Sequence, residues 1–560
     1  MSFRFALLSS TRQLVAWEAE SVKELAKENR AMCVAWVSTF GERVETTRQS
    51  LLRATLGGSE ATSVLNVAVS VPALKHALRV PCVFTARGHS IVVDGPTLQT
   101  LRGMDLDFVL YTGPKNLVGE IVSCARLGTW TFRFGDPNKD GSQITGFWEI
   151  LNGKNVVQAS LIQLGASRGV VLRSGHYAVI RSSYARTIDA IHFGAARWPA
   201  FVCRALGRDL DLASVSTGTI AEAEPALAPR QKDILKFVVM TKWRQTIATL
   251  HTAVYRPMWN VARIPSNIDV FLNAGKVPRA QWLGSSGTQR FLADPFAVNR
   301  CGTITVLAEE FDYREGKGRI VAFDLTDSGR DEIKVAIEEP HHLSFPYLLE
   351  HDGRIFCVPE SFETREIALY EAAEFPTRWT RVATLVRDFA GNDSTIIEER
   401  GKWWLFSTDH DLGFTSTLCV FSADRLYGPW IPHPMNPVKI DARSACSAGT
   451  PFKHDGVLYR PAQDCSEQYG KRVVINKVTC LTETRFSEEP VAFIEAFSGR
   501  YHAGTHTVSS VGDQTLVDGQ RFTMHFDGLR RLAKKYARSA LSAIGMSDEG
   551  IVRLKRRLRR

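Results

Sequence analysis

The chain of 560 residues is too long for one ordinary core, so two or three domains are expected. Hydrophobic residues make up 44% of it and charged residues 23%, which is ordinary for a soluble globular protein. Its ten cysteines are scattered singly without a CxxC pair, which argues against a zinc site or a disulfide framework and favours reduced thiols in the cytoplasm.

The net charge of +10 belongs to the end of the chain. From Leu529 onward there are eleven Lys or Arg residues against Asp548 and Glu549, and the preceding 528 residues are close to neutral. The first residues, MSFRFALLSSTRQLVAWEAE, do not have the pattern of a signal peptide. No window reaches about 18 uninterrupted apolar residues, so no transmembrane helix is expected.

Residues 1–205 have the pattern of an α/β domain. Short apolar runs such as AMCVAWV (31–37) alternate with helical or turn-rich stretches such as WEAESVKELAKEN (17–29). This alternation predicts a mostly parallel sheet with helices on both faces. Residues 206–254 are expected to form a linker, poor in large apolar groups, and then a bridging helix over about 232–253.

From about residue 255 to 526 the pattern becomes a repeat of short β-rich runs. Each unit has a glycine in a tight turn between two strands, with spacings of 51, 48, 55 and 56 residues: Gly302, Gly353, Gly401, Gly456 and Gly512. Five hairpin-centred units of this length predict a five-bladed β-propeller, because each four-stranded blade buries its faces only against its neighbours. Tandem all-β domains of another kind remain an alternative.

Carboxylates recur in phase with these glycines. Six follow the turns by six to eight residues: Glu309, Glu310, Glu360, Asp409, Asp464 and Asp518. Two more, Asp294 and Asp393, each precede a turn glycine by eight residues. Equivalent positions in successive blades lie around one axis, so we expect some of these groups to share one depression. Crowded carboxylates raise each other's pKa, which allows one to stay protonated while another is ionised, as glycosyl chemistry requires.

The alternative is that these carboxylates only cap strand ends. Among the cations nearby, His506, Arg443 and Arg460 are candidate ligands for sugar hydroxyls or phosphate, together with Glu309, Glu310 and Asp464. No loop has a recognisable metal-binding spacing, so no metal site is predicted and a divalent cation is left open.

Several long segments between 290 and 480 resemble the propeller domain at the N-terminus of plant glucosamine inositolphosphorylceramide transferases. They are FLADPF (291–296), HLSFPYLLEHDGRIFCVPES (342–361), DSTIIEERGKWWLFST (393–408), YGPWIPHPMNPV (427–438) and RPAQDCSEQYG (460–470). That family is similar to five-bladed glycosidases acting on arabinans and xylans. This looser similarity implies that Asp294 is the base-like carboxylate, Glu360 the proton donor and Asp393 a third acid that adjusts the pKa.

Residues 1 to about 205 also resemble a formyltransferase domain, through LGTWTFRFGDP (127–137), GFWEILNG (146–153) and ASLIQLGASRGVVLRSG (159–175). The resemblance places Thr131, Arg133 and Ser167 where that family has an Asn-x-His pair and an Asp. Arginine cannot act as a general base at neutral pH, so the usual formyl transfer is not expected. The domain is therefore predicted to be a degenerate, Rossmann-like relative, with Asp136 either in a repurposed site or only in a turn.

The basic tail, residues 527–560, is predicted to contain a cationic amphipathic helix. Apolar residues at helical spacing from Leu529 to Ile544 alternate with Arg and Lys residues, which suits an anionic membrane surface. A solvated tail and a nucleic-acid contact are alternatives, and nucleic acid is not expected because the rest of the chain has no aromatic-interleaved basic patch.

Together these features predict a cytoplasmic, peripheral membrane enzyme of cell-surface polysaccharide or glycolipid biosynthesis. Glycosyl transfer or hydrolysis would take place in the propeller, with a nucleotide sugar as a candidate donor and a glycan or glycolipid as substrate. The alternatives are a non-catalytic glycan-binding module for a partner glycosyltransferase, and formyl or acyl transfer in the first domain.

Overall fold

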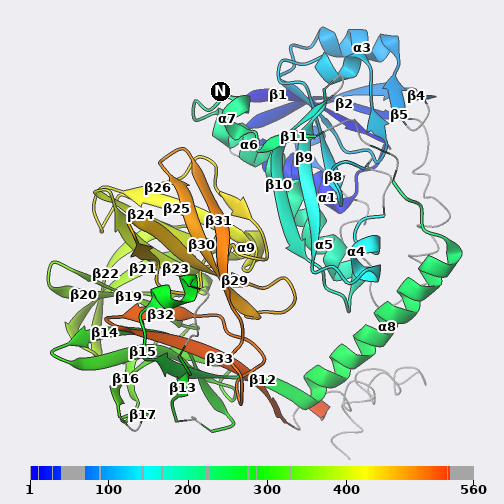
Figure 1. The fold of residues 1–560 in the computed structure, drawn as a ribbon. Helices are drawn as coiled ribbons and strands as arrows, with labels where there is room; N and C mark the ends of the chain where they lie inside the picture. The colour runs from blue at the N-terminus through cyan, green and yellow to red at the C-terminus, as the bar shows by residue number, and fades with distance from the viewer. Residues whose placement is uncertain are drawn as a thin grey trace, which may run out of the picture.

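The structure is a computed structural model (Figure 1). It describes residues 2–10, 12–27, 30–39, 68, 70–87, 90–139, 144–165, 168–220, 224, 226–273, 278–284, 287–327, 329–525 and 528–529. Ser167 and residues 530–560, which include nearly all of the predicted amphipathic tail, lie outside these ranges.

The N-terminal part is built on an eight-stranded mixed sheet with the order β11-β10-β9-β8-β6-β1-β2-β3. Five strands run parallel: β1 (Phe3–Ser9), β2 (Ala31–Thr39), β3 (Leu78–Cys82), β6 (Phe108–Tyr111) and β8 (Thr129–Phe134). Three continue antiparallel: β9 (Val156–Gln163), β10 (Gly169–Ala178) and β11 (Gly218–Ile220). A small sheet contains β4 (Phe84–Arg87), β5 (Ser90–Val93) and β7 (Asn116–Leu117).

Both faces of the large sheet are buried, as expected for parallel strands. Phe5 and Leu7 of β1 point into one hydrophobic core, and Ala6 and Leu8 point into another on the opposite face. The helices and 3-10 turns of this part are α1 (Ala16–Ala26), η3 (Pro72–Leu74), α3 (Gly95–Arg102), η4 (Glu120–Ser123), α4 (Phe147–Leu151), α5 (Tyr184–Ala196), α6 (Trp198–Leu206) and α7 (Leu212–Val215).

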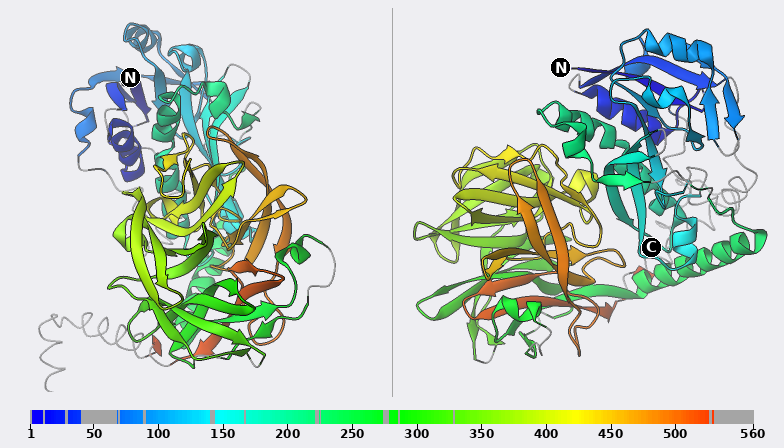
Figure 2. Two further views of the ribbon diagram at one scale, coloured as in Figure 1. Left: turned by 90° about the vertical axis from the view of Figure 1, so that its left-hand side faces the viewer. Right: turned by 45° about the horizontal axis from the view of Figure 1, so that its top comes forward.

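The segment between the two parts differs from the predicted linker at its start. Residues 218–220 form β11, which pairs with β10 and so belongs to the N-terminal sheet, because backbone pairing does not need large apolar side chains. Where the sequence predicts a bridging helix, the structure has α8 (Gln231–Val254), which runs directly into the first strand of the β-rich part (Figures 1 and 2). No helix in the described part of the chain is long and apolar enough to cross a membrane.

Within the described residues after 254, the strands form five separate antiparallel sheets. The first is closed by both ends of this region, since β12 (Tyr255–Ile264) and β13 (Gln281–Trp282) pair with β33 (Gln514–Met524) and β32 (Val508–Val511). The second contains β14 (Arg290–Arg300), β15 (Thr303–Asp312), β16 (Lys317–Thr326), β17 (Gly329–Arg330) and β18 (Lys334–Ile337). The short turn η5 (Ile268–Leu272) precedes β13.

The remaining three sheets follow in chain order. The third has β19 (Ser344–His351), β20 (Arg354–Glu360), β21 (Glu366–Glu374) and β22 (Arg378–Arg387), with η6 (Phe362–Thr364). The fourth has β23 (Gly391–Glu399), β24 (Lys402–Asp409), β25 (Thr417–Ala423), β26 (Ile431–Pro432) and β27 (Lys439–Ile440), with α9 (His410–Gly413). The fifth has β28 (Phe452–His454), β29 (Val457–Asp464), β30 (Arg472–Leu481) and β31 (Phe486–Ile494).

The repeated glycines occupy the hairpin turns that the sequence predicts. All five have positive φ angles, between 57° and 86°. In four of the turns the preceding residue also has positive φ, namely Cys301, Asp352, Arg400 and Asp455. Two successive residues of this kind define the type I′ turn, whose twist matches that of the flanking strands.

The N-terminal sheet is attached to the fourth β-sheet through buried arginines. The guanidinium of Arg173, on β10, donates from Nη1 to the carbonyl of Pro437 at 2.6 Å and from Nη2 to that of Met435 at 2.7 Å. Arg204 donates to the carbonyl of Asn436 at 2.6 Å. Because these groups are withdrawn from water, the contact gives the two parts a defined relative position.

Candidate functional site

Asp294 and Asp393 lie at the same point of their sheets, on β-bulges in the first strand of each hairpin. The pairing register shifts at both places, and the two residues have φ angles of 51° and 47°. Phe345, also eight residues before a turn glycine, has a φ of 43° at the matching bulge in β19. A bulge redirects a side chain, and backbone strain of this kind concentrates at functional sites.

Three more carboxylates come from the second strand of a hairpin. Glu309 on β15, Glu360 at the end of β20 and Asp518 on β33 are all buried, with at most 6% of each residue exposed. We refer to Asp294, Glu309, Glu360, Asp393, His506 and Asp518 as the central cluster. Asp294 and Asp393 are similarly buried, 5% and 6% exposed.

Hydrogen bonds link the cluster from one sheet to the next. The backbone N–H of Asp294 donates to Asp518 Oδ2 of the preceding sheet, that of Phe345 donates to Asp294 Oδ2, and that of Asp393 donates to Glu360 Oε2, each at 3.3 Å. In each case the donor is the bulged residue and the acceptor is a carboxylate of the sheet before it. The bulges therefore position the backbone as well as the side chains of the cluster.

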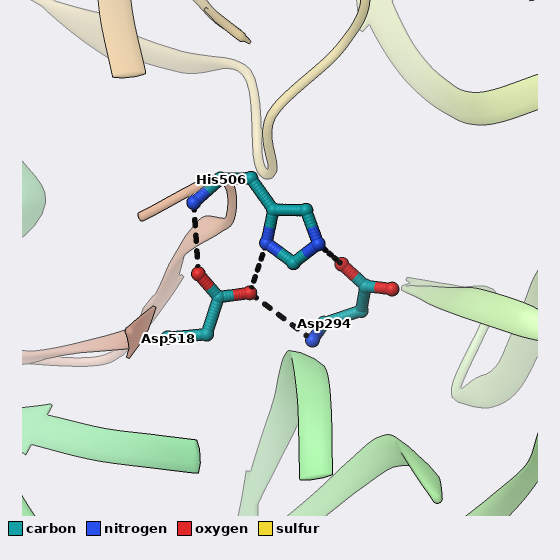
Figure 3. A group of neighbouring side chains, drawn as sticks. All are labelled: Asp294, His506 and Asp518. Atoms are coloured by element: carbon teal, nitrogen blue, oxygen red, sulfur yellow. Dashed lines mark hydrogen bonds and ion pairs between the residues drawn. The ribbon is translucent and has the colours of Figure 1, made fainter. Parts of the chain in front are cut away.

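His506 lies between two aspartates (Figure 3). Its Nδ1 is 2.5 Å from Asp518 Oδ2, and its Nε2 is 3.6 Å from Asp294 Oδ1. The hydroxyl of Thr507 donates to the same Asp294 oxygen at 2.6 Å. Burial alone would lower the pKa of His506, but the charges of Asp518 and Asp294 outweigh it and raise that pKa. The arrangement therefore favours an imidazolium that both aspartates stabilise.

The same three side chains bring one ligand atom each within 4.8 Å of one another. A divalent cation bound there would require a neutral imidazole nitrogen. Both ring nitrogens of His506 face carboxylates, and the raised pKa keeps its proton. The donor set thus fits a protonated histidine better than a metal ligand.

The imidazole is fixed from both faces by neighbouring groups. Trp259 stacks on it with ring centroids 3.9 Å apart, and Tyr469 meets it edge-on at 5.4 Å. Gly470, with a φ of 63°, makes the close approach possible, because a Cβ there would lie 2.7 Å from the Trp259 ring and 3.0 Å from His506 Cβ. This packing fixes the orientation of the His506 ring, as a functional site requires.

On the other side of the cluster, Glu360 and Asp393 form a carboxyl pair. Burial raises the pKa of each, and the charge of Glu360 raises that of Asp393 further. Gln463 donates to Asp393 Oδ2 at 2.8 Å, and the thiol of Cys446 donates to the same oxygen at 3.1 Å. We therefore expect this pair to hold a proton at neutral pH.

The remaining carboxylates of the cluster differ in their surroundings. Burial raises the pKa of Glu309 well above its ordinary value, and the charges of Asp294, Glu360 and Asp518 add to this rise. Burial also raises the pKa of Asp294, but the adjacent His506 and the Thr507 hydroxyl oppose it. Among the four carboxylates of the cluster whose pKa is raised, Asp294 is the one with an imidazole and a hydroxyl as partners.

Four predicted binding residues are not brought to the cluster. Glu310, on the opposite face of β15 from Glu309, pairs with Arg319 at 2.8 Å, because successive residues of a strand point to opposite faces. Asp464 pairs with Arg472 at 2.9 Å. Arg443 pairs with Asp441 at 2.7 Å, and the fully buried Arg460 pairs with Glu488 at 2.6 Å and donates to the carbonyls of Ala445 and Ser444.

The residues that the sequence reasoning missed are Trp259, Cys446, Gln463, Thr507 and, as a partner of His506, Asp518. Gln463 lies within the segment RPAQDCSEQYG that carried the resemblance, and Thr507 is next to His506. A neutral side chain has no periodic signature of its own, so its approach to a carboxylate becomes visible only in three dimensions.

Two of the formyltransferase-like positions, Thr131 and Arg133, lie within the described residues, and both are buried. Arg133 is buried on β8 and donates to Asn116 Oδ1 at 2.6 Å, and Thr131 is buried on the same strand. Asp136 accepts from the backbone N–H of Asn138 at 2.9 Å, which is a turn contact.

The family match falls in the β-rich part of the chain. Residues 279–520 match the family model described as glucosamine inositolphosphorylceramide transferase 1, N-terminal, which confirms the resemblance predicted for 290–480. The curated protein glucosamine inositolphosphorylceramide transferase 1 of Arabidopsis thaliana is 33% identical over 262 residues, and that of Oryza sativa subsp. japonica is 32% identical over 248. These matches cover 44% and 41% of this chain but only 34% and 33% of the relatives, so the chain spans about a third of their length.

Solved structures with partial similarity are carbohydrate-cleaving enzymes. A family 117 glycoside hydrolase of Zobellia galactanivorans is 14% identical, with a TM-score of 0.32, over 44% of this chain and 89% of that one. The catalytic domain of a GH62 α-L-arabinofuranosidase of Coprinopsis cinerea is also 14% identical, with a TM-score of 0.31, over 42% and 93%. Similarity at this level supports no conclusion about chemistry.

Proposed function

We propose that the central cluster catalyses glycosyl transfer or hydrolysis on a glycan or glycolipid of the cell surface. The observation that carries the proposal is that the carboxylates of the cluster have two kinds of neighbours. Glu360 and Asp393 adjoin each other, whereas Asp294 has an imidazole and a hydroxyl as partners. Glycosyl chemistry needs one carboxyl as proton donor and another as base or nucleophile.

In this proposal Glu360, whose pKa burial raises, donates the proton to the leaving oxygen, and the adjacent Asp393 adjusts that pKa through its hydrogen bonds. Asp294 acts as the base-like carboxylate on the other side, and His506 and Asp518 orient it and stabilise its charge. The name of these relatives supports a glycolipid substrate and a transferred amino sugar, for which a nucleotide sugar is the natural donor.

The test is product detection by mass spectrometry, with pooled nucleotide sugars and membrane glycolipid extract. Glu360→Gln, which removes the proton but keeps the shape, should reduce product formation by about 10²–10⁴-fold. Glu350→Gln is the matched control, because Glu350 is an exposed carboxylate of the same sheet. Equal product from both variants would contradict a catalytic role of Glu360.

A second candidate is a non-catalytic glycan-binding module for a partner transferase. It is favoured by the deep burial of the cluster and by its hydrogen bonds, which would serve a purely structural centre equally well. In that case neither variant would alter the activity of the reconstituted pathway. The same assay thus separates the two candidates.

We also propose an identity for each of the two parts of the fold. Each of the five antiparallel sheets would be one blade of a five-bladed β-propeller with the cluster at its axis. The N-terminal part would be a formyltransferase-like domain without the family's catalytic residues, since Arg133 is buried and Thr131 cannot act as a base.

Membrane association is proposed from α8 and the basic tail. Exposed apolar side chains follow one face of α8, with Trp243 66% exposed: Leu235, Val239, Trp243, Ile247 and Leu250. The described chain ends at Gly528 and Leu529 next to the C-terminal end of α8, where His525 donates to the carbonyl of Val254. Apolar contact and basic charge in one place suit an anionic inner membrane surface in the cytoplasm. Trp243→Glu should reduce co-sedimentation with anionic vesicles, and unchanged co-sedimentation would contradict this proposal.

A further inference from the structure

A cavity of about 550 Å³ lies between the N-terminal part and the fifth β-sheet. One wall is the segment that links β10 to α5, with Arg181 and Arg186, together with Arg244 of α8. The other wall is the loop between β29 and β30, with Ser466, Gln468 and Tyr469. The cavity is therefore assembled only when the two parts of the chain are docked.

Its charge is strongly positive. Arg181, Arg186 and Arg244 have no carboxylate within ion-pair distance among the residues that the structure describes. By contrast, the buried Arg460 pairs with Glu488, and the buried Arg173 donates to two carbonyls. The lining residues include one carboxylate, the exposed Glu467, which leaves two positive charges in excess.

The arginines are held in place by neutral groups. Arg181 donates from Nη2 to the carbonyl of Gly153 at 2.6 Å and also to Asn155 Oδ1. Arg244 donates from Nη1 to the carbonyl of Ile150 at 3.1 Å. Burial, together with the charge of Arg181, lowers the pKa of Arg244. Two guanidiniums are thus fixed close together without a counter-ion, an arrangement that costs free energy unless an anion binds.

The cavity also adjoins the central cluster. Tyr469 lines it with a side chain that is 43% exposed, and the same ring contacts His506 with centroids 5.4 Å apart. A ligand anchored by its charge in the cavity would therefore be separated from His506 by the side chain of Tyr469.

We propose that this interdomain cavity binds a phosphate or diphosphate group of the substrate, held by Arg181, Arg186 and Arg244. Arginine matches phosphate because its planar fork donates two parallel hydrogen bonds, and Ser466, Gln468 and Tyr469 supply further polar contacts. The phosphate could come from a nucleotide-sugar donor or from a phosphoinositol headgroup. The anion site stands on the cavity alone, and only its link to the cluster rests on the proposed function.

The test is isothermal titration calorimetry of the full chain with three probes: inorganic phosphate, UDP and myo-inositol 1-phosphate. We expect at least one phosphorylated probe to bind, and Arg244→Glu to weaken it at least about tenfold. The charge-matched control is Lys236→Glu, an exposed residue of the same helix outside the cavity, which should bind as the wild type does. Arg186→Glu, at an exposed position, repeats the test where folding is not at risk.

Preference for UDP would assign the cavity to a nucleotide donor. Preference for inositol phosphate would assign it to a lipid headgroup. Either result supports the inference. No binding of any probe at millimolar concentration would overturn it, as would equal affinity in Arg244→Glu, Arg186→Glu and the wild type. Glu360→Gln should keep full binding even if it forms no product. If Glu360→Gln abolished binding, the ligand would belong to the cluster and the cavity site would be overturned.

Discussion

Glu309 and Glu310 are neighbours on β15, yet their carboxylates lie in opposite electrostatic environments. Glu309 points into the central cluster, where burial and three other carboxylates raise its pKa. Glu310 points to the other face, where Arg319 and Arg290 pair with it at 2.8 and 3.6 Å. The same contrast separates Asp294, Glu360 and Asp393 from Asp464. The carboxylates of the central cluster are therefore crowded together, whereas Glu310 and Asp464 are each paired with an arginine.

This difference teaches that a carboxylate's position after a turn does not determine its chemistry. The partner that reaches it decides whether it is a structural anion or a group able to hold a proton. Five substitutions test how firmly the two environments are separated.

The largest effect is expected in the central cluster. Asp294→Asn keeps the side-chain shape but removes the anion, so we expect product formation to fall by about 10²–10⁴-fold, with little change in thermal stability. Asp327→Asn, an exposed aspartate of the same sheet, is the control. Product formation by Asp294→Asn at the wild-type rate would show that the central carboxylates have no role that the paired ones lack.

A smaller but still large effect is expected at the paired ions. Arg460→Met removes the main partner of the buried Glu488, whose pKa Arg460 and Lys439 lower against the effect of burial. We expect a loss of about 3–5 kcal/mol in the free energy of unfolding, measured by urea denaturation. The partly exposed pair Arg443–Asp441 serves as the comparison, and Arg443→Met should cost less than about 1 kcal/mol.

The next largest effect is expected from a substitution that disturbs the packing around His506. Gly470→Ala should destabilise the protein by about 2–4 kcal/mol, because a Cβ would press on Trp259 and His506 at a left-handed position. Gly456→Ala is the matched control, with a φ of 74° and open space around the site, and should cost only about 1 kcal/mol. Equal losses in the two variants would mean that the imidazole is not closely packed.

The smallest effect concerns pH. The folded-state pKa of Glu309 is raised, so its contribution to stability is complete below the unfolded value of 4.5 and is lost as pH rises through the folded value. Glu309→Gln should therefore be about 1–2 kcal/mol more stable than the wild type at pH 8 and depend less on pH.

Asp312 provides the opposite sign on the same strand. Arg314 and Arg290 lower the pKa of Asp312 against the effect of burial, so its contribution is present above 3.8 and lost as pH falls. Asp312→Asn should be less stable than the wild type at pH 7 and equal to it under strongly acidic conditions. Denaturation curves of both variants, measured across pH, test this contrast. If both substitutions changed the pH dependence of stability in the same direction, the contrast between Glu309 and Asp312 would be contradicted.

Several features could be predicted from the sequence because they depend on local pattern. The turn glycines, the hairpins around them, the bridging helix and the shared offset of Asp294 and Asp393 follow from backbone conformation and strand alternation. These are properties of a few neighbouring residues, and a repeat makes them visible several times. The formyltransferase resemblance and the amphipathic tail stay predictions.

The tertiary structure alone decided which charged residues meet. Arg460 and Arg443, predicted as ligands, pair with Glu488 and Asp441, whereas Thr507 and Gln463 reach the cluster from separate sheets. The cavity with Arg181, Arg186 and Arg244 combines a β10–α5 segment, a helix and a distant loop. Sequence periodicity determines which face a side chain points to. The neighbour it meets there depends on how whole sheets pack, because electrostatic interactions act across space between residues far apart in the chain.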